Sequence, residues 1–501
     1  MLFKLFHPSR LLRLAKWLTF AAVLVFVTFI GTRIWFSQSG APLEPWHTYV
    51  PKELSIYEME KVDWKGFIAA EDRIFEDVRR EVTQKLPEHD RIPSNRYFSG
   101  SVVYPPSFSH DWNRSYVLVP DGQPKGAVVL LHGLTDSPYS LRHIAQRYVQ
   151  AGYAVVAPRL PGHGTVPAGL TEAKWEDWLA ATRLAVREAR RLGGPEGKLQ
   201  IVGFSNGGAL ALKYALDALD DPALARPERL VLISPMIGIT RFARFAGLAG
   251  LPAFLPAFSK AAWLSVIPEF NPFKYNSFPV NGARQSHRLT QALQEAISRH
   301  AANHTLGDLP QTLTFQSVMD FTVSTRAILT AFYNLLPANG SELVLFDLNR
   351  NTKLGPLLRG ATSPNALARS LPPPPRNFRT VIITNIDPGT GEVAERITEA
   401  GSTEVIERPL NLFYPPDVFS LSHVALPFPS SDGLYGAHPS SDPSEDFGLQ
   451  LGAMSVRGER GALIVAMDAL SRMSSNPFYP YLQRRVDEGI GSADPAGMKK
   501  E

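Results

Sequence analysis

Short apolar runs alternate with longer amphipathic stretches along most of the chain from residue 115 onward. The apolar runs are rich in β-branched residues and are bounded by turn-forming residues, which is typical of buried strands. They cover residues 116–119, 127–131, 154–157, 199–202, 230–233, 312–316 and 343–347. Between them, apolar residues repeat at helical spacing in the stretches 140–150, 175–192 and 206–219. Strands that alternate with helices predict an α/β fold, a mostly parallel sheet covered by helices.

Two segments interrupt this alternation. Residues 236–305 include an apolar, proline-punctuated stretch between two predicted strands, and we expect an inserted lid there. Residues 350–420 contain LPPPPRNF and one extra strand candidate at 380–384, and we interpret them as an insertion. The globular domain then spans residues 115–475, and residues 476–501 are expected to form a C-terminal tail.

The chain begins with a basic block that is followed by an uncharged apolar stretch, LTFAAVLVFVTFIGT. The block contains four cations, Lys4, Arg10, Arg13 and Lys16. With Arg33 snorkelling to the interface, residues 17–36 approach the roughly 20 residues that a bilayer core requires. We therefore expect a transmembrane segment at residues 17–36.

The charges around this segment predict its orientation. Cations before it outnumber those after it, so the positive-inside rule puts residues 1–16 in the cytoplasm. No A-x-A site follows the apolar stretch closely, which favours an uncleaved signal anchor over a removed signal peptide. We expect a protein anchored in the inner membrane of a bacterium, with its globular domain facing the periplasm. Residues 37–114 are expected to form a linker and a helical extension, with an amphipathic helix at 64–88.

Composition excludes several classes of protein. The formal net charge of +4 over 501 residues argues against a dedicated nucleic-acid-binding protein. The chain has no cysteine, so disulfides, thiolate metal sites and a cysteine nucleophile are excluded. His287, His300 and His304 lack a spaced set of carboxylates, and we expect neither a metal nor a nucleotide cofactor.

One motif carries a candidate nucleophile. Gly203, Ser205 and Gly207 in IVGFSNGG form the pattern G-x-S-x-G, between a predicted strand and a predicted helix. This context is that of a sharp turn that exposes a serine hydroxyl, in which side chains at the glycines would collide with neighbouring elements. Upstream, the strand in VVLLHGLTDS ends in His132-Gly133, where backbone N–H groups can stabilise an oxyanion. We expect the oxyanion donors to be the N–H groups of Leu134 and Asn206.

Three segments in the first half of the domain carry a family resemblance, LLHGLTDSPYSLRHIAQRYVQAGYAVVAPRLPGHG, WEDW and IVGFSNGG. With them, the chain from about residue 116 to 475 resembles the α/β-hydrolases, and among these the bacterial carboxylesterases, monoacylglycerol lipases and lysophospholipase-like serine hydrolases. The resemblance implies an α/β-hydrolase fold and a catalytic triad in the chain order Ser, acid, His. His163, in the P-G-H-G segment, is interpreted as structural.

The resemblance implies that the catalytic acid follows the strand at 312–316. Asp320 in SVMDFTVS occupies that place. Asp308 comes before the strand, and Asp347, at the end of the next strand, is the alternative acid.

The base is expected beyond the last strand, where the chain offers His423 and His438. His423, in SLSHVALPF, resembles the catalytic-histidine loop of the family. It follows Asp347 by 76 residues (423 − 347), where the family has a short loop. Either the insertion at 350–420 folds outward and returns to the site, or the strand count near the end of the domain is wrong.

Ser205, His423 and Asp320 together predict a serine hydrolase that cleaves carboxylic esters through an acyl-enzyme intermediate. The apolar lid and the anchor favour a small-molecule or lipid ester as substrate and a membrane as partner, without nucleic acid. Two alternatives remain, a peptidase or amidase on the same fold and a catalytically inactive hydrolase-fold scaffold.

Overall fold

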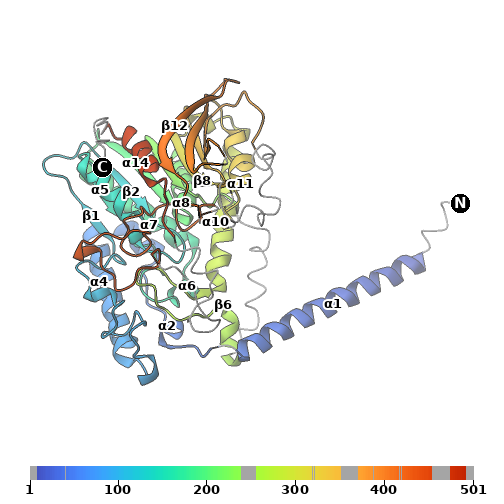
Figure 1. The fold of residues 1–501 in the computed structure, drawn as a ribbon. Helices are drawn as coiled ribbons and strands as arrows, with labels where there is room; N and C mark the ends of the chain where they lie inside the picture. The colour runs from blue at the N-terminus through green and yellow to red at the C-terminus, as the bar shows by residue number, and fades with distance from the viewer. Residues whose placement is uncertain are drawn as a thin grey trace.

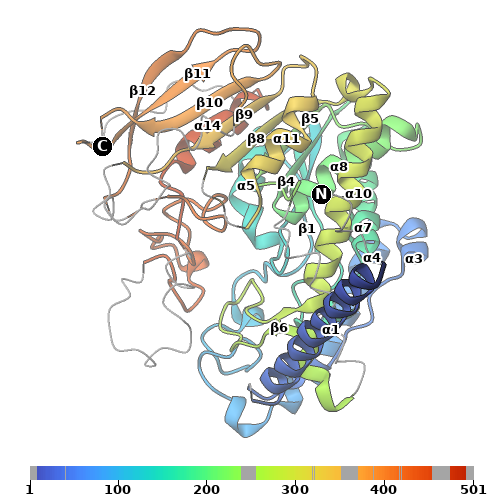
Figure 2. The same cartoon turned by 90° about the vertical axis from the view of Figure 1, so that its right-hand side faces the viewer.

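The computed structural model describes residues 8–39, 41–238, 256–318, 320, 322–350, 371–387, 389–416, 418, 420–453 and 474–491. Ten strands of these residues form one twisted sheet (Figures 1 and 2). In spatial order they are β1 (Tyr116–Leu118), β3 (Ala154–Ala157), β2 (Gly126–Leu131), β4 (Lys198–Phe204), β5 (Arg229–Ile233), β8 (Gln311–Ser317), β9 (Glu342–Phe346), β10 (Arg379–Asn385), β11 (Glu392–Thr398) and β12 (Ile406–Phe413). The strands from β3 to β10 run parallel, whereas β1, β11 and β12 pair antiparallel at the two ends.

Helices cover both faces of the sheet because the strands are apolar on both sides. Along β2, Val129 and Leu131 belong to one core cluster, and Val128 and Leu130 belong to the other. The first cluster lies under α7 (Trp175–Gly193), α8 (Asn206–Asp220), α10 (Val280–Ala302) and α11 (Thr325–Ala331). The second lies under α5 (Arg142–Gln150) and α14 (Tyr479–Glu488). The sheet is therefore the middle of three layers, as the alternation of strands and helices predicts.

The eight strands predicted from apolar runs, including the candidate at 380–384, are confirmed within three residues at each end. The strands β11 and β12 were not predicted. They lie in the range interpreted as an insertion, of which residues 351–370 are outside the described residues. β10 continues the parallel sheet beside β9, and β11 and β12 extend it as a hairpin. The second of the two explanations for the distance between Asp347 and His423 is therefore correct.

Two predicted boundaries are wrong. The lid expected over residues 236–305 includes α10, but Leu289, Leu293 and Ile297 of this helix are fully buried in the main core. α10 is therefore a sheet-covering helix, and residues 239–255 are outside the described residues. The tail expected from residue 476 includes α14, whose Tyr481 and Leu482 are buried under the sheet. In both segments an apolar face meets the sheet across a long sequence separation.

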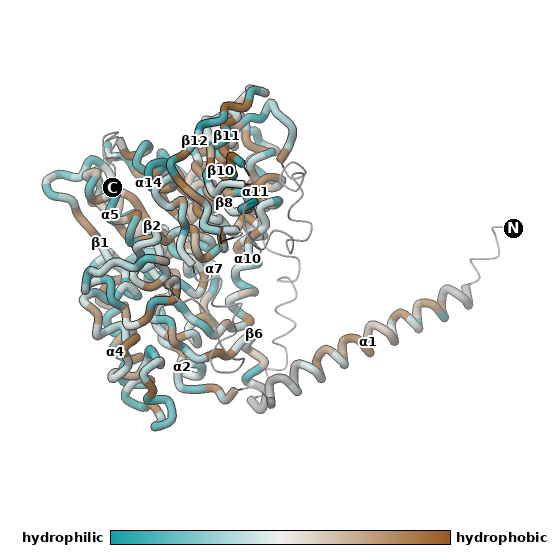
Figure 3. Tube along the Cα trace, viewed as in Figure 1, coloured by the Kyte–Doolittle hydropathy of each residue, from teal (hydrophilic) through white to brown (hydrophobic). Residues whose placement is uncertain are grey.

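A long helix precedes the domain. α1 (Pro8–Ser39) projects from the body of the molecule in Figure 1, and its middle is strongly apolar in Figure 3. Leu12–Thr32 has a mean hydropathy of 2.0, and none of it is buried. By length and composition alone this helix can cross a membrane or act as a signal sequence.

An extension joins α1 to the sheet and packs on it. Its α4 ends at residue 81 and not at 88, because two short 3-10 turns follow. The extension contains α2 (Pro45–Thr48), α3 (Ile56–Lys61), α4 (Trp64–Glu81), η1 (Thr83–Lys85), η2 (Glu88–Asp90) and η3 (Pro105–Ser107). Met59 and Phe67 of this extension are buried in the main core. The remaining short elements are η4 (Pro138–Leu141), α6 (Gly169–Glu172), η7 (Pro256–Ala262), β6 (Trp263–Ser265), β7 (Phe278–Pro279), η8 (Leu306–Asp308), η9 (Tyr333–Leu335) and η11 (Pro443–Glu445).

Candidate active site

Ser205 lies at a strained turn between β4 and α8. Its backbone has φ 54° and ψ −112°, a conformation that a non-glycine residue rarely adopts. The turn is held by neighbouring backbone groups: the N–H of Ser205 donates to the carbonyl of Ile233 (2.9 Å), and its carbonyl accepts the N–H of Met236 (3.0 Å). Strain of this kind persists only where the surroundings fix it, and it is concentrated at functional sites.

The glycines around Ser205 are required by close packing. A Cβ on Gly203 would lie 2.3 Å from the carbonyl oxygen of Gly207, and one on Gly207 would lie 1.9 Å from that of Leu131. Both distances are far shorter than van der Waals contact. The pattern G-x-S-x-G therefore serves the packing of α8 against β2 and β4, as its sequence context predicts.

His423 and Asp320 lie in hydrogen-bond contact although 103 residues separate them. Nδ1 of His423 is 2.7 Å from Oδ2 of Asp320, and the side chains are 6% and 0% exposed. Burial raises the pKa of Asp320, but the contact with His423 and the N–H groups of Val323 and Thr322 outweigh it and lower this pKa. Asp320 is therefore kept as the carboxylate, which favours the tautomer of His423 with hydrogen on Nδ1 and an unprotonated Nε2.

The imidazole of His423 lies beside the serine turn. Its ring stacks on that of Phe204, the residue before Ser205, with ring centroids 5.3 Å apart and an interplanar angle of 28°. Phe204 itself is buried at the end of β4. The stack brings the base candidate to the end of the sheet at which the nucleophile candidate sits.

The alternative acids, Asp347 and Asp308, and the alternative base, His438, either bind other groups or lie at the surface. Asp347 accepts hydrogen bonds from Thr384 (2.9 Å) and the N–H of Leu348 (2.8 Å). Asp308 is exposed in η8, and His438 is exposed in a turn. Among the described residues, Asp320 is thus the carboxylate that contacts His423.

The loop after β2 lies against Ser205. A Cβ on Gly133 would be 3.4 Å from Cβ of Ser205 and 3.3 Å from the ring of Phe204. The loop forms a turn that is closed by the N–H of Asp136 and the carbonyl of Gly133 (3.4 Å). This turn contains Leu134, one of the two expected oxyanion donors. The other, Asn206, is the first residue of α8, where a backbone N–H has no acceptor within the helix.

The two histidines near this loop are structural. His132 is fully buried, with Nδ1 2.9 Å from the carbonyl of Gly133 and Nε2 accepting the N–H of Leu160 (3.0 Å). His163 has Nδ1 3.1 Å from the carbonyl of Pro161, and burial lowers its pKa to about 4. Both rings stay neutral, His132 joins the two loops, and the centroids of the two rings lie 5.1 Å apart. These contacts agree with the structural interpretation of His163.

One buried acid beside the site was not singled out from the sequence. Asp136 is 4% exposed and accepts the N–H of Ser137 (2.9 Å). Burial raises its pKa to about 6, and Lys274 and His423 oppose this shift only in part. Asp136 lies in the segment HGLTDS, but no periodicity or spacing in the sequence indicates that an isolated aspartate is buried.

Two groups of side chains in the described residues have the donor types of a cation site. One is Glu44, His89 and Asp90, and the other is His143, Asp432 and Glu445. In the second, Arg142 donates to both carboxylates and supplies the counter-charge. Of the histidines weighed from the sequence, His300 contacts the hydroxyl of Thr305 (2.7 Å).

Comparison with known proteins identifies related chains for part of the molecule. Residues 122–348 match the family model Hydrolase_4, described as serine aminopeptidase, S33. A thermostable monoacylglycerol lipase of Bacillus sp. (strain H-257) is 44% identical over 54 residues, which are 11% of this chain and 22% of the lipase. The magnesium-chelatase 30 kDa subunit of Rhodobacter capsulatus is 30% identical over 146 residues, 28% of this chain and 48% of the subunit. The chain thus spans about a fifth and about half of these curated relatives.

Among solved structures, one of the metagenome-derived lipolytic enzymes LipS and LipT is similar. It is 22% identical, with 47% of this chain and 88% of that chain covered and a TM-score of 0.38. The family match and the sheet topology agree with the predicted fold. The chain has an α/β-hydrolase fold and resembles esterases and monoacylglycerol lipases.

Proposed function

We propose that this protein is a serine hydrolase that cleaves carboxylic esters, with Ser205 as nucleophile, His423 as general base and Asp320 as the orienting acid. The observation that carries the proposal is the 2.7 Å contact between His423 and Asp320 beside the strained turn of Ser205. A buried histidine–carboxylate pair next to a strained turn that holds a serine is the arrangement that nucleophilic acyl transfer requires.

The proposed mechanism has two steps. Nε2 of His423 accepts the hydroxyl proton as Oγ of Ser205 attacks the ester carbon, and Asp320 stabilises the imidazolium that forms. The N–H groups of Leu134 and Asn206 donate to the oxyanion of the tetrahedral intermediate. His423 then gives its proton to the leaving alcohol, which leaves an acyl-serine. Water, deprotonated by the same imidazole, attacks this acyl group and restores Ser205.

We also propose that the substrate is a small or lipid-like acyl ester and that α1 anchors the enzyme in a membrane. The apolar helix Leu12–Thr32 supports the anchor, and the monoacylglycerol lipase relative supports the substrate class. The charge asymmetry around the helix favours a cytoplasmic N-terminus and an outward-facing domain. Deletion of residues 2–38 is expected to move the protein from the membrane fraction to the soluble fraction.

A fluorophosphonate probe and an ester panel test the proposal. We expect the probe to label wild-type protein but not Ser205→Ala, and we expect Ser205→Ala to lose at least about 10³-fold in the hydrolysis of p-nitrophenyl esters. Labelling of folded wild-type protein that persists in Ser205→Ala, or the absence of labelling, would refute the assignment. Activity confined to aminoacyl p-nitroanilides would instead favour a peptidase, the activity named in the description of the matching family.

A further inference from the structure

The loop that contains Leu134 has a backbone conformation that its own residues do not favour. Thr135 has φ 62°, in the left-handed region, where a β-branched residue is a rare outlier. Such a conformation persists only when surrounding groups fix it. Its carbonyl accepts the N–H of Tyr275 at 2.8 Å. The loop is therefore held from outside, by a segment 140 residues away (275 − 135).

Tyr275 belongs to a segment, residues 269–277, that we call the strap. The strap is closed on itself by Glu269, whose carboxylate accepts the N–H groups of Asn276 (3.0 Å) and Ser277 (2.7 Å). It contacts the site at a second point through the hydroxyl of Tyr275, which accepts the N–H of Thr165 (2.8 Å) and donates to the carbonyl of Gly162 (3.1 Å). The strap thus joins the loop after β2 to the P-G-H-G loop.

The strap is in turn held by the N-terminal extension. The guanidinium of Arg96, 2% exposed, donates to the carbonyl of Asn271 at 3.1 Å, and the N–H of Arg96 donates to the carbonyl of Glu269 at 3.0 Å. Arg96 also donates to Oδ1 of Asn113 (3.1 Å), and Nδ2 of Asn113 donates to the carbonyl of Pro272 (3.0 Å). Two buried side chains of the extension therefore satisfy the backbone of the strap.

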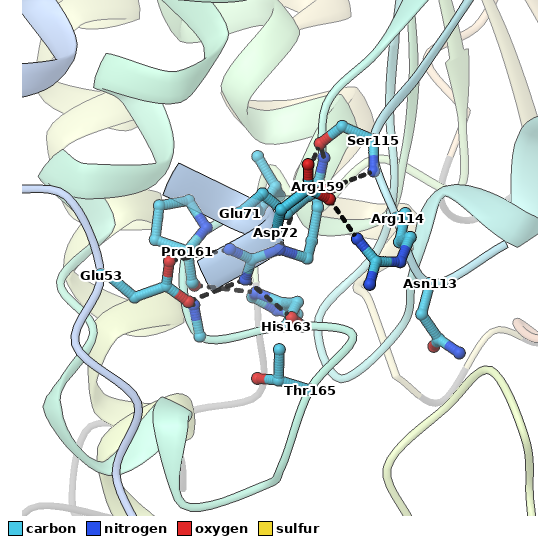
Figure 4. Close-up of polar contacts among 12 residues, drawn as sticks. Glu53, Glu71, Asp72, Asn113, Arg114, Ser115, Arg159, Pro161, His163 and Thr165 are labelled. Carbon is cyan, nitrogen blue, oxygen red and sulfur yellow. Dashed lines mark hydrogen bonds and ion pairs between the residues drawn. The ribbon is translucent and has the colours of Figure 1, made fainter. Parts of the chain in front are cut away.

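The extension also binds the P-G-H-G loop. Figure 4 shows Arg159, just before this loop, between Glu53 and Glu71 of the extension. Glu53 also accepts the N–H of Gly162 at 2.8 Å. The P-G-H-G loop is thus fixed directly, and the loop after β2 through the strap, by residues between α1 and β1, outside the part of the chain that matches the hydrolase family.

We propose that the N-terminal extension positions the oxyanion loop of the enzyme, and that Arg96 is the positioning residue that acts through the strap. The inference rests on the proposed function. Arg96 orders the strap, the N–H of Tyr275 fixes the carbonyl of Thr135, and the turn then aims the N–H of Leu134 at the developing oxyanion. Because this N–H acts on charge that develops in the transition state, its misplacement lowers kcat and leaves substrate binding nearly unchanged.

The test compares full-length variants in detergent with matched controls. We expect Arg96→Ala to lower kcat for a p-nitrophenyl ester about 100-fold with KM nearly constant, because small misplacements at a reacting centre have effects of that size. The affinity for an alkyl trifluoromethyl ketone, whose adduct with Ser205 carries an oxyanion, should fall by a similar factor. Arg91→Ala, an exposed arginine of the same segment, should change neither quantity.

Two further variants keep the proposal falsifiable if Arg96→Ala does not fold. Arg96→Lys retains a cationic donor and should recover part of kcat, and Asn113→Ala should lower kcat and ketone affinity together. A folded Arg96 or Asn113 variant with wild-type kcat and ketone affinity would overturn the proposal, as would a rise in KM at constant kcat. The proposed function itself fails on a different result, the absence of fluorophosphonate labelling and ester turnover in the wild type.

Discussion

Two buried clusters of charge, one around Arg159 and one formed by His423 and Asp320, have opposite character. Around Arg159, which is 1% exposed, Nε donates to Glu71 and both terminal nitrogens donate to Glu53. One of these terminal nitrogens, Nη1, also donates to the carbonyl of His163. In the pair of His423 and Asp320, by contrast, the contact with the carboxylate uses Nδ1 and leaves Nε2 as the nitrogen that can exchange a proton.

The difference separates a structural cluster from the pair that we propose to be catalytic. A buried arginine that is paired with two carboxylates stays protonated, so its contacts hold elements together. A buried imidazole with one engaged nitrogen has a fixed tautomer and a second nitrogen at which a proton can be taken up. Changes to the first cluster should therefore affect stability, and changes to the second should affect turnover.

The largest expected effect is on turnover. We expect Asp320→Asn to lower kcat for esters by about 10⁴-fold, because an amide at this place favours the wrong tautomer of the base. The control is Asp347→Asn, the alternative acid, which should retain kcat because Asp347 contacts Thr384 and not His423. Steady-state kinetics of the two variants show which aspartate supports catalysis. Equal losses of kcat would contradict the assignment of Asp320.

The next effect is on stability. Arg159→Met leaves Glu71 and Glu53 without their cation, and breaking a buried ion pair by removing one partner costs roughly 3 to 5 kcal/mol. Denaturant unfolding should measure this loss, while folded molecules of the variant keep fluorophosphonate reactivity. Arg396→Met serves as the control and should unfold like the wild type, because the side chains of Arg396 and its partner Glu407 are 45% and 43% exposed. Unchanged stability of Arg159→Met would remove the distinction between the clusters.

A smaller effect depends on pH and concerns Asp136. Its pKa is raised to about 6 in the folded state from 3.8, so the unfolded chain releases this proton first and folding stability falls as pH rises from about 4 to about 7. Asp136→Asn cannot ionise and still offers an oxygen to the N–H of Ser137. We expect the variant to gain about 2 kcal/mol relative to the wild type between pH 4 and pH 7.5.

Unfolding by denaturant at both pH values measures this difference, because titrations elsewhere in the chain cancel between the two proteins. A difference that does not change with pH would contradict the burial of a titrating Asp136.

The smallest effect is expected at the surface. Arg79 and Glu76 of α4 form an ion pair at 2.6 Å, but both side chains are more than half exposed. Water screens such pairs and solvates the separated charges. Arg79→Ala should leave the melting temperature unchanged within measurement error. A clear drop in a thermal scan would mean that exposure does not separate weak charge pairs from strong ones in this protein.

The regions predicted well are those in which local pattern and tertiary role coincide. β2, β4 and β5 are short β-branched runs, and each is buried on both faces. The glycines around Ser205 are visible as letters because a tight turn leaves no room for a Cβ. Asp320 and His423 were put forward through a resemblance and a chain order, and the structure brings them to 2.7 Å. Their catalytic roles stay proposals.

The regions predicted poorly depend on partners distant in sequence. β12 has no continuous apolar run to recognise, because its residues are mostly exposed at the sheet edge. The sequence predicts a lid at α10 and a tail at α14, because an amphipathic pattern does not indicate which surface will cover its apolar face. Arg96 and Asn113 belong to no periodic pattern in the sequence. Their partners are backbone carbonyls of the strap, which no sequence pattern marks.

The sequence by itself determined the strand-and-helix alternation, the tight turn at Ser205 and the absence of cysteine chemistry, because each of these follows from local sterics or from residue type. Only the tertiary structure decided which carboxylate meets His423, that the sheet continues through β12, and that residues before β1 hold the strap and the P-G-H-G loop. These are contacts between segments far apart in the chain, and their formation depends on packing geometry that no local pattern contains.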